Sequence, residues 1–227
     1  MSTYALIHGG GDSGWSWHLL AAELRSRGHR VVAPDLRADD DTATLSDYAR
    51  AVEREVGEPD GDLIVVGHSF GAFTAPLVAG ASSLVLIAGM IPAPGESPDD
   101  WWGNTGYGAA SQEAAERDGG LTGNADPFVS FYHDVPRELA EEALRRERAH
   151  PSPLSTSAVW PLESWPPVPT RFVLCTEDRF FPPEFFRRLV SERLGIVPEE
   201  IAAGHCVALS RPKELADLLT GVDTRHG

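Results

Sequence analysis

LIVVGHSFGA, residues 63–72, holds the strongest structural signal in this chain. Its four apolar residues at 63–66 predict a strand that is buried on both faces. The pattern Gly-x-Ser-x-Gly follows around Ser69, and it is typical of a nucleophile elbow, a tight strand-to-helix turn that exposes a serine hydroxyl. The alternative is a glycine turn with a helix-capping serine. The strand before Ser69 and the helix expected over residues 70–79 favour the elbow.

Strand and helix patterns alternate on both sides of this turn. The strands are expected at residues 3–8, 30–35, 63–66, 83–88, 170–175 and 197–202, and the helices at residues 15–28, 44–56, 70–79, 182–194 and 212–219. Such alternation predicts an α/β fold with a mostly parallel sheet of about six strands and helices on both faces.

The alternation stops between residues 90 and 167. This stretch has no apolar run of strand type, and its clearest helical pattern covers residues 136–149. We therefore expect one domain over residues 1–227, with a core at 1–89 and 168–227 and a cap inserted at 90–167 after the fourth strand. The aromatic pair Trp101 and Trp102 forms either a lid over a site or the small core of this cap.

Composition limits the classes of partner. The chain of 227 residues carries a formal charge of −15, which argues against nucleic acid and anionic membrane, because both need a basic face. No apolar run is long enough to span a bilayer, and the N-terminus does not resemble a signal peptide. Cys175 and Cys206 do not make a disulfide framework, so we expect a cytoplasmic protein with reduced thiols.

Polar residues gather where the expected parallel strands end, and such ends meet at one edge of the sheet. Ser69 follows the third strand, and His205 follows the last one. Because serine is a weak nucleophile without a base, we expect His205 to take its proton. Asp178, just beyond the fifth strand, is the expected acid that orients His205. Glu177 and, more distantly, Asp35 compete for that role.

A glycine loop at residues 9–11 follows the first strand. Acyl transfer passes through an oxyanion, which backbone N–H donors stabilise. The N–H of Phe70 and an N–H of the loop, for which we choose Gly10, are the expected donors. A phosphate-binding loop is disfavoured, because no Gly-Lys-Ser/Thr ending follows the glycines.

Five stretches together carry a family resemblance: LIHGGGDSGWSW at 6–17, GHRVVAPDL at 28–36, VVGHSFG at 65–71, residues 178–189, and GHCVALSRP at 204–212. The chain resembles the small α/β-hydrolases related to plant methylesterases and hydroxynitrile lyases, including their bacterial esterase relatives. The resemblance implies an α/β-hydrolase fold, with nucleophile Ser69, acid Asp178, base His205 and oxyanion donors Gly10 and Phe70.

Two departures from the lyases bear on the chemistry. The lyases carry a lysine where this chain has Cys206 and a threonine where it has Gly9. Without that cation a cyanide leaving group is harder to stabilise, which favours the esterases. The substrate pocket is expected to include Gly9, His68, Trp101, Trp102 and Cys206. His133 and His150 show no metal-ligand spacing, so no metal is expected.

The sequence therefore predicts a serine hydrolase that cleaves a small, largely apolar carboxylic ester through an acyl-enzyme, without metal or organic cofactor. The alternative is a lyase or cyclase that uses the same residues as acid and base on a biosynthetic intermediate. A third interpretation is a non-catalytic ligand receptor, because a fold alone does not fix a function. The expected partner is a small-molecule ester, and the sequence leaves a homodimer open.

Overall fold

Six parallel strands form one sheet in the computed structural model, which describes residues 1–36, 40–149 and 151–221; His150 lies outside the described residues. The strands are β1 (Ser2–Ile7), β2 (Arg30–Val32), β3 (Asp62–His68), β4 (Ser83–Ile87), β5 (Thr170–Cys175) and β6 (Glu199–Ile201). Their order is β2-β1-β3-β4-β5-β6, and all neighbouring pairs are parallel. This arrangement confirms the expected fold class.

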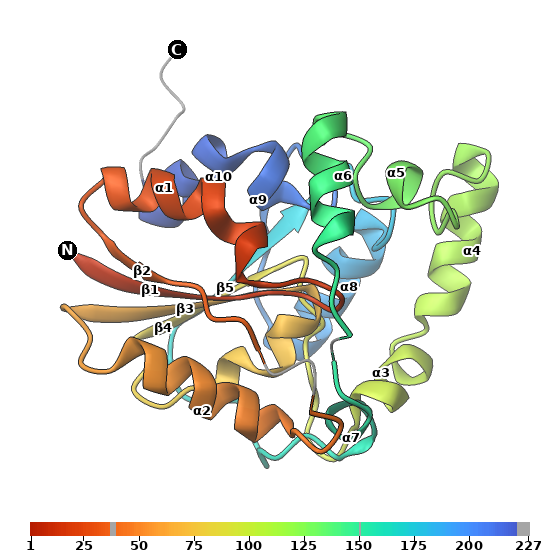
Figure 1. Cartoon of the computed structure of the whole chain (residues 1–227). Helices are drawn as coiled ribbons and strands as arrows, with labels where there is room; N and C mark the ends of the chain where they lie inside the picture. Colours follow the sequence, from red (N-terminus) through yellow and green to blue (C-terminus); the bar gives the residue numbers. More distant parts are fainter. Residues whose placement is uncertain (37–39, 150, 222–227) are drawn as a thin grey trace.

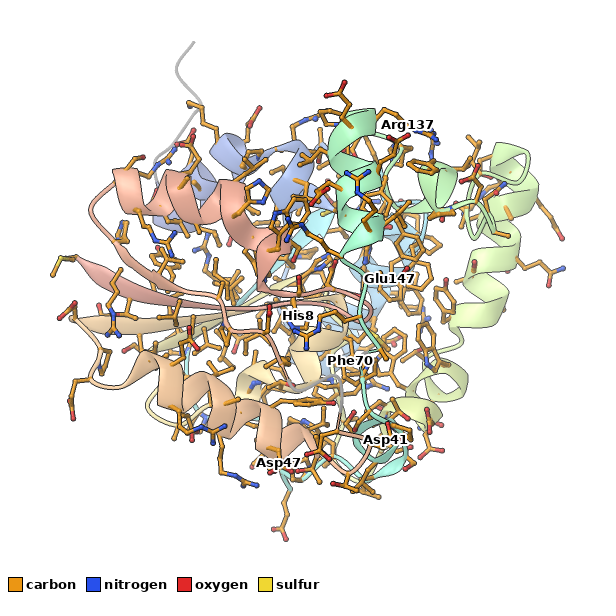
Figure 2. The ribbon with its side chains drawn as sticks, viewed as in Figure 1. His8, Asp41, Asp47, Phe70, Arg137 and Glu147 are labelled. Carbon is orange, nitrogen blue, oxygen red and sulfur yellow. The ribbon has the colours of Figure 1, made fainter. Side chains whose placement is uncertain are left out.

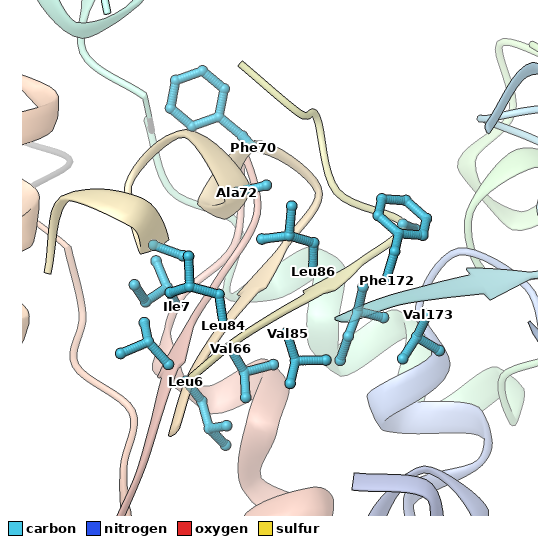
Figure 3. Close-up of a cluster of buried hydrophobic side chains, with 14 of the residues drawn as sticks. Leu6, Ile7, Val66, Phe70, Ala72, Leu84, Val85, Leu86, Phe172 and Val173 are labelled. Atoms are coloured by element: carbon cyan, nitrogen blue, oxygen red, sulfur yellow. The ribbon is translucent and has the colours of Figure 1, made fainter. Parts of the chain in front are cut away.

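The centre of the sheet is apolar on both faces. Leu6 and Ile7 of β1, Val66 of β3 and Leu86 of β4 are fully buried, and Figure 3 shows them packed across adjacent strands. Burying each of these side chains stabilises the fold by roughly 1.5–3 kcal/mol relative to leaving it in water. The register places Ile7 opposite Gly67, so β1 and β3 end together beside Ser69.

Helices cover both faces of the sheet. In Figure 1, α1 (His18–Ser26) and α10 (Pro212–Thr220) lie above the sheet and α2 (Leu45–Val56) lies below it. The remaining core helices are α8 (Pro183–Leu194) and the short α9 (Val207–Ser210). A capping box between Thr44 and Asp47 begins α2. No helix in the described part of the chain is long and apolar enough to cross a membrane.

The helix expected over residues 70–79 is wrong in type. Two 3-10 helices, η2 (Ser69–Phe73) and η3 (Ala75–Leu77), occupy this stretch instead. Pro76 explains the break, because proline lacks the backbone N–H and its ring clashes with the carbonyl four residues earlier. The chain thus leaves the elbow in short turns rather than in one α-helix.

The stretch between β4 and β5, residues 88–169, is named here the inserted segment. Its described residues form five helices: α3 (Pro98–Asn104), α4 (Tyr107–Asp118), α5 (Pro127–Ser130), α6 (Arg137–Arg145) and α7 (Pro153–Ser157). No strand interrupts them within the described residues of the segment. Figure 1 shows α3, α4 and α5 beyond the end of the sheet where β1 and β3 terminate.

Candidate active site

Ser69 sits at the turn between β3 and η2 in a strained conformation. Its φ of 49° lies in the left-handed region, where Ala88 is the only other described residue that is not glycine. The turn is tight because the backbones nearly touch: a Cβ on Gly71 would lie 2.5 Å from the Ile7 carbonyl oxygen, and one on Gly67 would lie 2.8 Å from the Gly71 carbonyl oxygen. Both glycines of the pattern are therefore required by space.

His205 and Asp178 are hydrogen-bonded to each other. The His205 Nδ1 lies 2.8 Å from the Asp178 Oδ2, and both side chains are buried. The other oxygen, Oδ1, accepts the backbone N–H groups of Phe180 and Phe181 at 2.8 and 3.0 Å. Because Asp178 accepts on both oxygens, Nδ1 of His205 donates and its Nε2 is left as an acceptor. This tautomer suits a general base.

Ser69 and His205 line one cavity of about 300 Å³. Ser69 is 8% exposed and His205 is 4% exposed, so both residues are buried. In the described part of the chain no hydrogen bond joins the two side chains. Such bonds often form only when substrate is bound. Gly10 and Phe70, the expected oxyanion donors, line the same cavity.

Hydrogen bonds with His8 and Asp35 orient the glycine loop. The Leu36 N–H donates to His8 Nε2 at 3.1 Å, so His8 Nδ1 carries the proton that bonds to the Gly9 carbonyl at 2.9 Å. Burial lowers the pKa of His8 to about 4, which keeps it neutral at pH 7. Asp35, the distant candidate for the acid, instead accepts the Gly14 N–H at 2.7 Å and pairs with Arg148. Asp35 thus holds the loop.

His68 contacts the loop that carries His205. Its Nε2 lies 2.9 Å from the His205 carbonyl oxygen, and the two rings are 4.7 Å apart. Burial, followed by the nearby His205, lowers the pKa of His68 to about 3. A neutral imidazole therefore buttresses the loop that carries His205. Gly9 packs against Ser69 and His68, where an added Cβ would lie 3.1 Å from the Ser69 Cβ.

Of the two tryptophans expected in the pocket, only Trp102 lines the cavity. Trp101 is fully buried and donates its indole N–H to the Ile91 carbonyl at 2.9 Å. It packs edge-on against Phe181 and Phe185. The pocket prediction for Trp101 is therefore wrong, because its neighbours hold it in the core. Glu177, the rival acid, is exposed. Gly9, His68 and Cys206, which were predicted for the substrate pocket, line the cavity.

Several residues that line the cavity were not predicted from the sequence. They include Asp12, Phe131, Tyr132, Glu147 and Phe180. Asp12 and Phe180 lie inside stretches that already carried the motif, so the signal for them was position in the glycine loop and in the turn after Asp178. Phe131 and Glu147 come from the inserted segment, and Figure 2 shows Glu147 just below α6, on the same side of the molecule as Phe70.

The profile of the Alpha/beta hydrolase family matches residues 5–218 of this chain. The chain therefore belongs to the α/β-hydrolase family, a family of enzymes. This membership confirms the family and the fold that the sequence predicted.

Three named relatives and one solved structure are similar to this chain over nearly its whole length. Norfluorocurarine synthase 1 from Strychnos nux-vomica is 28% identical over 249 residues, covering 95% of this chain and 93% of the relative. Putative methylesterase 19 from Arabidopsis thaliana is 24% identical over 254 residues, covering 98% of each chain. Polyneuridine aldehyde esterase from Rauvolfia serpentina is 25% identical over 250 residues, covering 96% of this chain and 94% of the relative. A crystal structure of polyneuridine aldehyde esterase superposes with a TM-score of 0.76 at 23% identity, covering 98% of this chain and 99% of that chain.

Proposed function

We propose that this protein is a carboxylesterase in which Ser69, His205 and Asp178 form a catalytic triad. The observation that carries the proposal is the 2.8 Å bond between His205 and Asp178, at the cavity that also holds the strained Ser69. Esterase-type relatives that cover nearly the whole chain support the same reaction class.

The reaction proceeds in two halves. The Ser69 Oγ bonds to the ester carbonyl carbon while its proton moves to Nε2 of His205, and the N–H groups of Gly10 and Phe70 stabilise the resulting oxyanion. The C–O bond then breaks, and the leaving alcohol takes the proton from His205. Water attacks the acyl-enzyme, His205 takes a proton from that water, and collapse returns this proton to Ser69 and releases the carboxylic acid. Asp178 keeps His205 oriented throughout.

The substrate that the cavity supports is small and largely apolar near the reacting carbon. Phe70, Met90, Phe131 and Phe180 supply apolar walls around Ser69. A cavity of about 300 Å³ lies at the lower end of the range for small-molecule sites. Short-chain esters are therefore the expected substrates.

Hydrolysis of p-nitrophenyl acetate and butyrate tests the proposal. Ser69→Ala should lower kcat/KM at least about 10³-fold, because the nucleophile is lost while binding remains. Ser26→Ala, on the exposed side of α1, is the matched control and should keep full activity. Unchanged hydrolysis in Ser69→Ala would refute the assignment of the nucleophile.

A second candidate is a reaction without net hydrolysis, in which the same residues act as acid and base. The relative named norfluorocurarine synthase 1 favours it, since a protein of similar sequence carries a synthase name. Analysis of the products separates the two candidates. An esterase releases one acid and one alcohol per ester consumed, whereas the alternative gives a rearranged or eliminated product whose formation still requires His205.

A further inference from the structure

Acidic side chains line the cavity beside the proposed triad. Asp12, Asp99 and Glu147 all line it. Asp12, in the glycine loop, is half-buried, and burial raises its pKa to about 7. Within the described parts of the chain, neither the Asp12 nor the Glu147 side chain has a hydrogen bond or ion pair. Glu147 packs over the loop, where a Cβ on Gly11 would lie 3.3 Å from its Oε1.

No described lysine or arginine lines the cavity to balance these acids. The nearby arginines are engaged elsewhere. Arg146 pairs with Glu142 at 2.5 Å and lies over the Trp15 ring at 5.0 Å, and Arg148 pairs with Asp35 at 3.0 Å. The cavity therefore faces its ligand with excess negative charge, within a chain whose formal charge is −15.

Residues other than these acids also indicate that the cavity binds a ligand. Ser69 and His205 are both more than nine-tenths buried and face the cavity, and within the described chain the Ser69 hydroxyl and His205 Nε2 have no hydrogen-bond partner. Aromatic side chains line the cavity beside His205. They are Trp102, Phe131 and Phe180, and the Phe131 and Phe180 rings lie 4.6 Å from each other and 5.3 and 5.4 Å from the His205 ring. Aromatic faces attract cations, quaternary ammonium groups above all.

We infer that this cavity selects esters carrying a protonated or quaternary amine, with Asp12 and Glu147 as counter-charges and the aromatic wall as the surface that packs against the cation. The inference rests on the proposed esterase function, because it places the reacting carbonyl at Ser69. An ester carrying a free carboxylate is disfavoured for the same reason, since like charges repel inside a cavity of low dielectric.

Acetylcholine and 3,3-dimethylbutyl acetate test this selectivity. The two esters have nearly the same shape, but the second has a carbon atom in place of the charged nitrogen. At pH 8, where Asp12 is largely ionised, we expect kcat/KM for the cationic ester to exceed that for the neutral ester at least tenfold. Asp12→Asn should lower this ratio at least fivefold, and Glu147→Gln should lower it less, because Glu147 is exposed. Glu55→Gln, which removes an exposed charge of α2, should leave the ratio unchanged.

Binding to Ser69→Ala separates this inference from the proposed function. Quenching of tryptophan fluorescence reports occupancy, because Trp102 lines the cavity. If the wild type hydrolyses neither ester, the esterase proposal fails, but tighter binding of acetylcholine than of its neutral analogue still supports the cation site. Equal binding, tighter binding of the neutral ester, binding of neither ester, or a ratio that Asp12→Asn leaves unchanged would overturn the inference.

Discussion

Asp178 shows how the backbone fixes the role of one side chain. Two N–H groups of the turn that follows hold one carboxylate oxygen, and the second oxygen is therefore directed at His205. Its neighbour Glu177 points outward and is exposed, although the two residues are adjacent in the sequence. The sequence predicted Asp178 as the acid that orients His205 but did not exclude Glu177. Only the turn geometry distinguishes the two carboxylates.

Asp178→Asn should lower kcat on short esters by roughly 10²–10⁴-fold, because an amide no longer holds His205 in the tautomer whose Nε2 accepts a proton. Steady-state kinetics with p-nitrophenyl butyrate measures the loss. Glu177→Gln is the matched control and should change kcat less than about twofold. Equal losses in both variants would mean that Asp178 is not the acid.

Burial of the Asp12 carboxylate lowers the free energy of unfolding by an amount that depends on pH. Its pKa is about 7 in the folded chain, against the ordinary value of 3.8. The folded state therefore holds the proton to higher pH than the unfolded state, and stability falls as pH rises between these values by about 1.4 kcal/mol per unit.

Asp12→Asn should therefore stabilise the folded chain by roughly 2–4 kcal/mol at pH 8, with the gain shrinking to near zero at pH 4. Urea unfolding at the two pH values measures the difference. A variant with no advantage over the wild type at pH 8 would contradict the unfavourable burial of this carboxylate.

At the scale of elements, the glycines of the elbow keep β1, β3 and η2 in close contact. Gly71→Ala places a Cβ 2.5 Å from the Ile7 carbonyl oxygen and 2.7 Å from that of His8. Both contacts are with backbone, which cannot move aside cheaply. We expect a loss of about 2–4 kcal/mol in the free energy of unfolding, together with loss of esterase activity.

Gly108→Ala is the control for this prediction. Gly108 lies in α4, and an added Cβ would meet nothing within 4 Å. Alanine there should stabilise the chain by about 0.5–1 kcal/mol, because it favours a helix more than glycine does. Denaturant unfolding measures both variants. A Gly71→Ala protein as stable as the wild type would show that the elbow tolerates a wider turn.

Strands and helices were predicted correctly where hydrophobic periodicity was strong. Short helices that are marked only by a capping residue and a proline were missed. The strands of the core were located from apolar runs, and β3 proved longer than the expected residues 63–66 because it continues to His68. In the inserted segment only α6 was foreseen. The short helices α3, α5 and α7 each begin with a capping side chain followed by proline, at Ser97, Asp126 and Ser152. That signal is present in the sequence, but these helices are too short for periodicity to reveal.

At the scale of the whole molecule, a buried ion pair fastens the inserted segment to the core. The Arg193 guanidinium of α8 binds the Glu96 carboxylate at 2.6 and 2.8 Å, and their side chains are 15% and 4% exposed. The same guanidinium donates to the Ile91 carbonyl at 2.6 Å. The sequence could not predict this pair, because its members lie 97 positions apart with no pattern linking them.

Arg193→Met should lower the free energy of unfolding by about 3–5 kcal/mol, because it leaves Glu96 buried without its cation. Thermal and urea unfolding measure the loss. Arg50→Met, which removes an exposed partner of Asp47, should cost less than about 1 kcal/mol. Similar small effects for both would mean that the inserted segment is held in place by packing alone.

Labelling with a fluorophosphonate tests the central claim most directly, because the reagent reacts with a serine only when a base and an oxyanion site activate it. Mass spectrometry of the intact protein should show one adduct, and peptide mapping should place it on Ser69. Ser69→Ala should take no label, and His205→Ala should react at least about 100-fold more slowly. Absence of labelling in the wild type, or an adduct that persists in Ser69→Ala, would contradict the claim that Ser69, His205 and Asp178 work together.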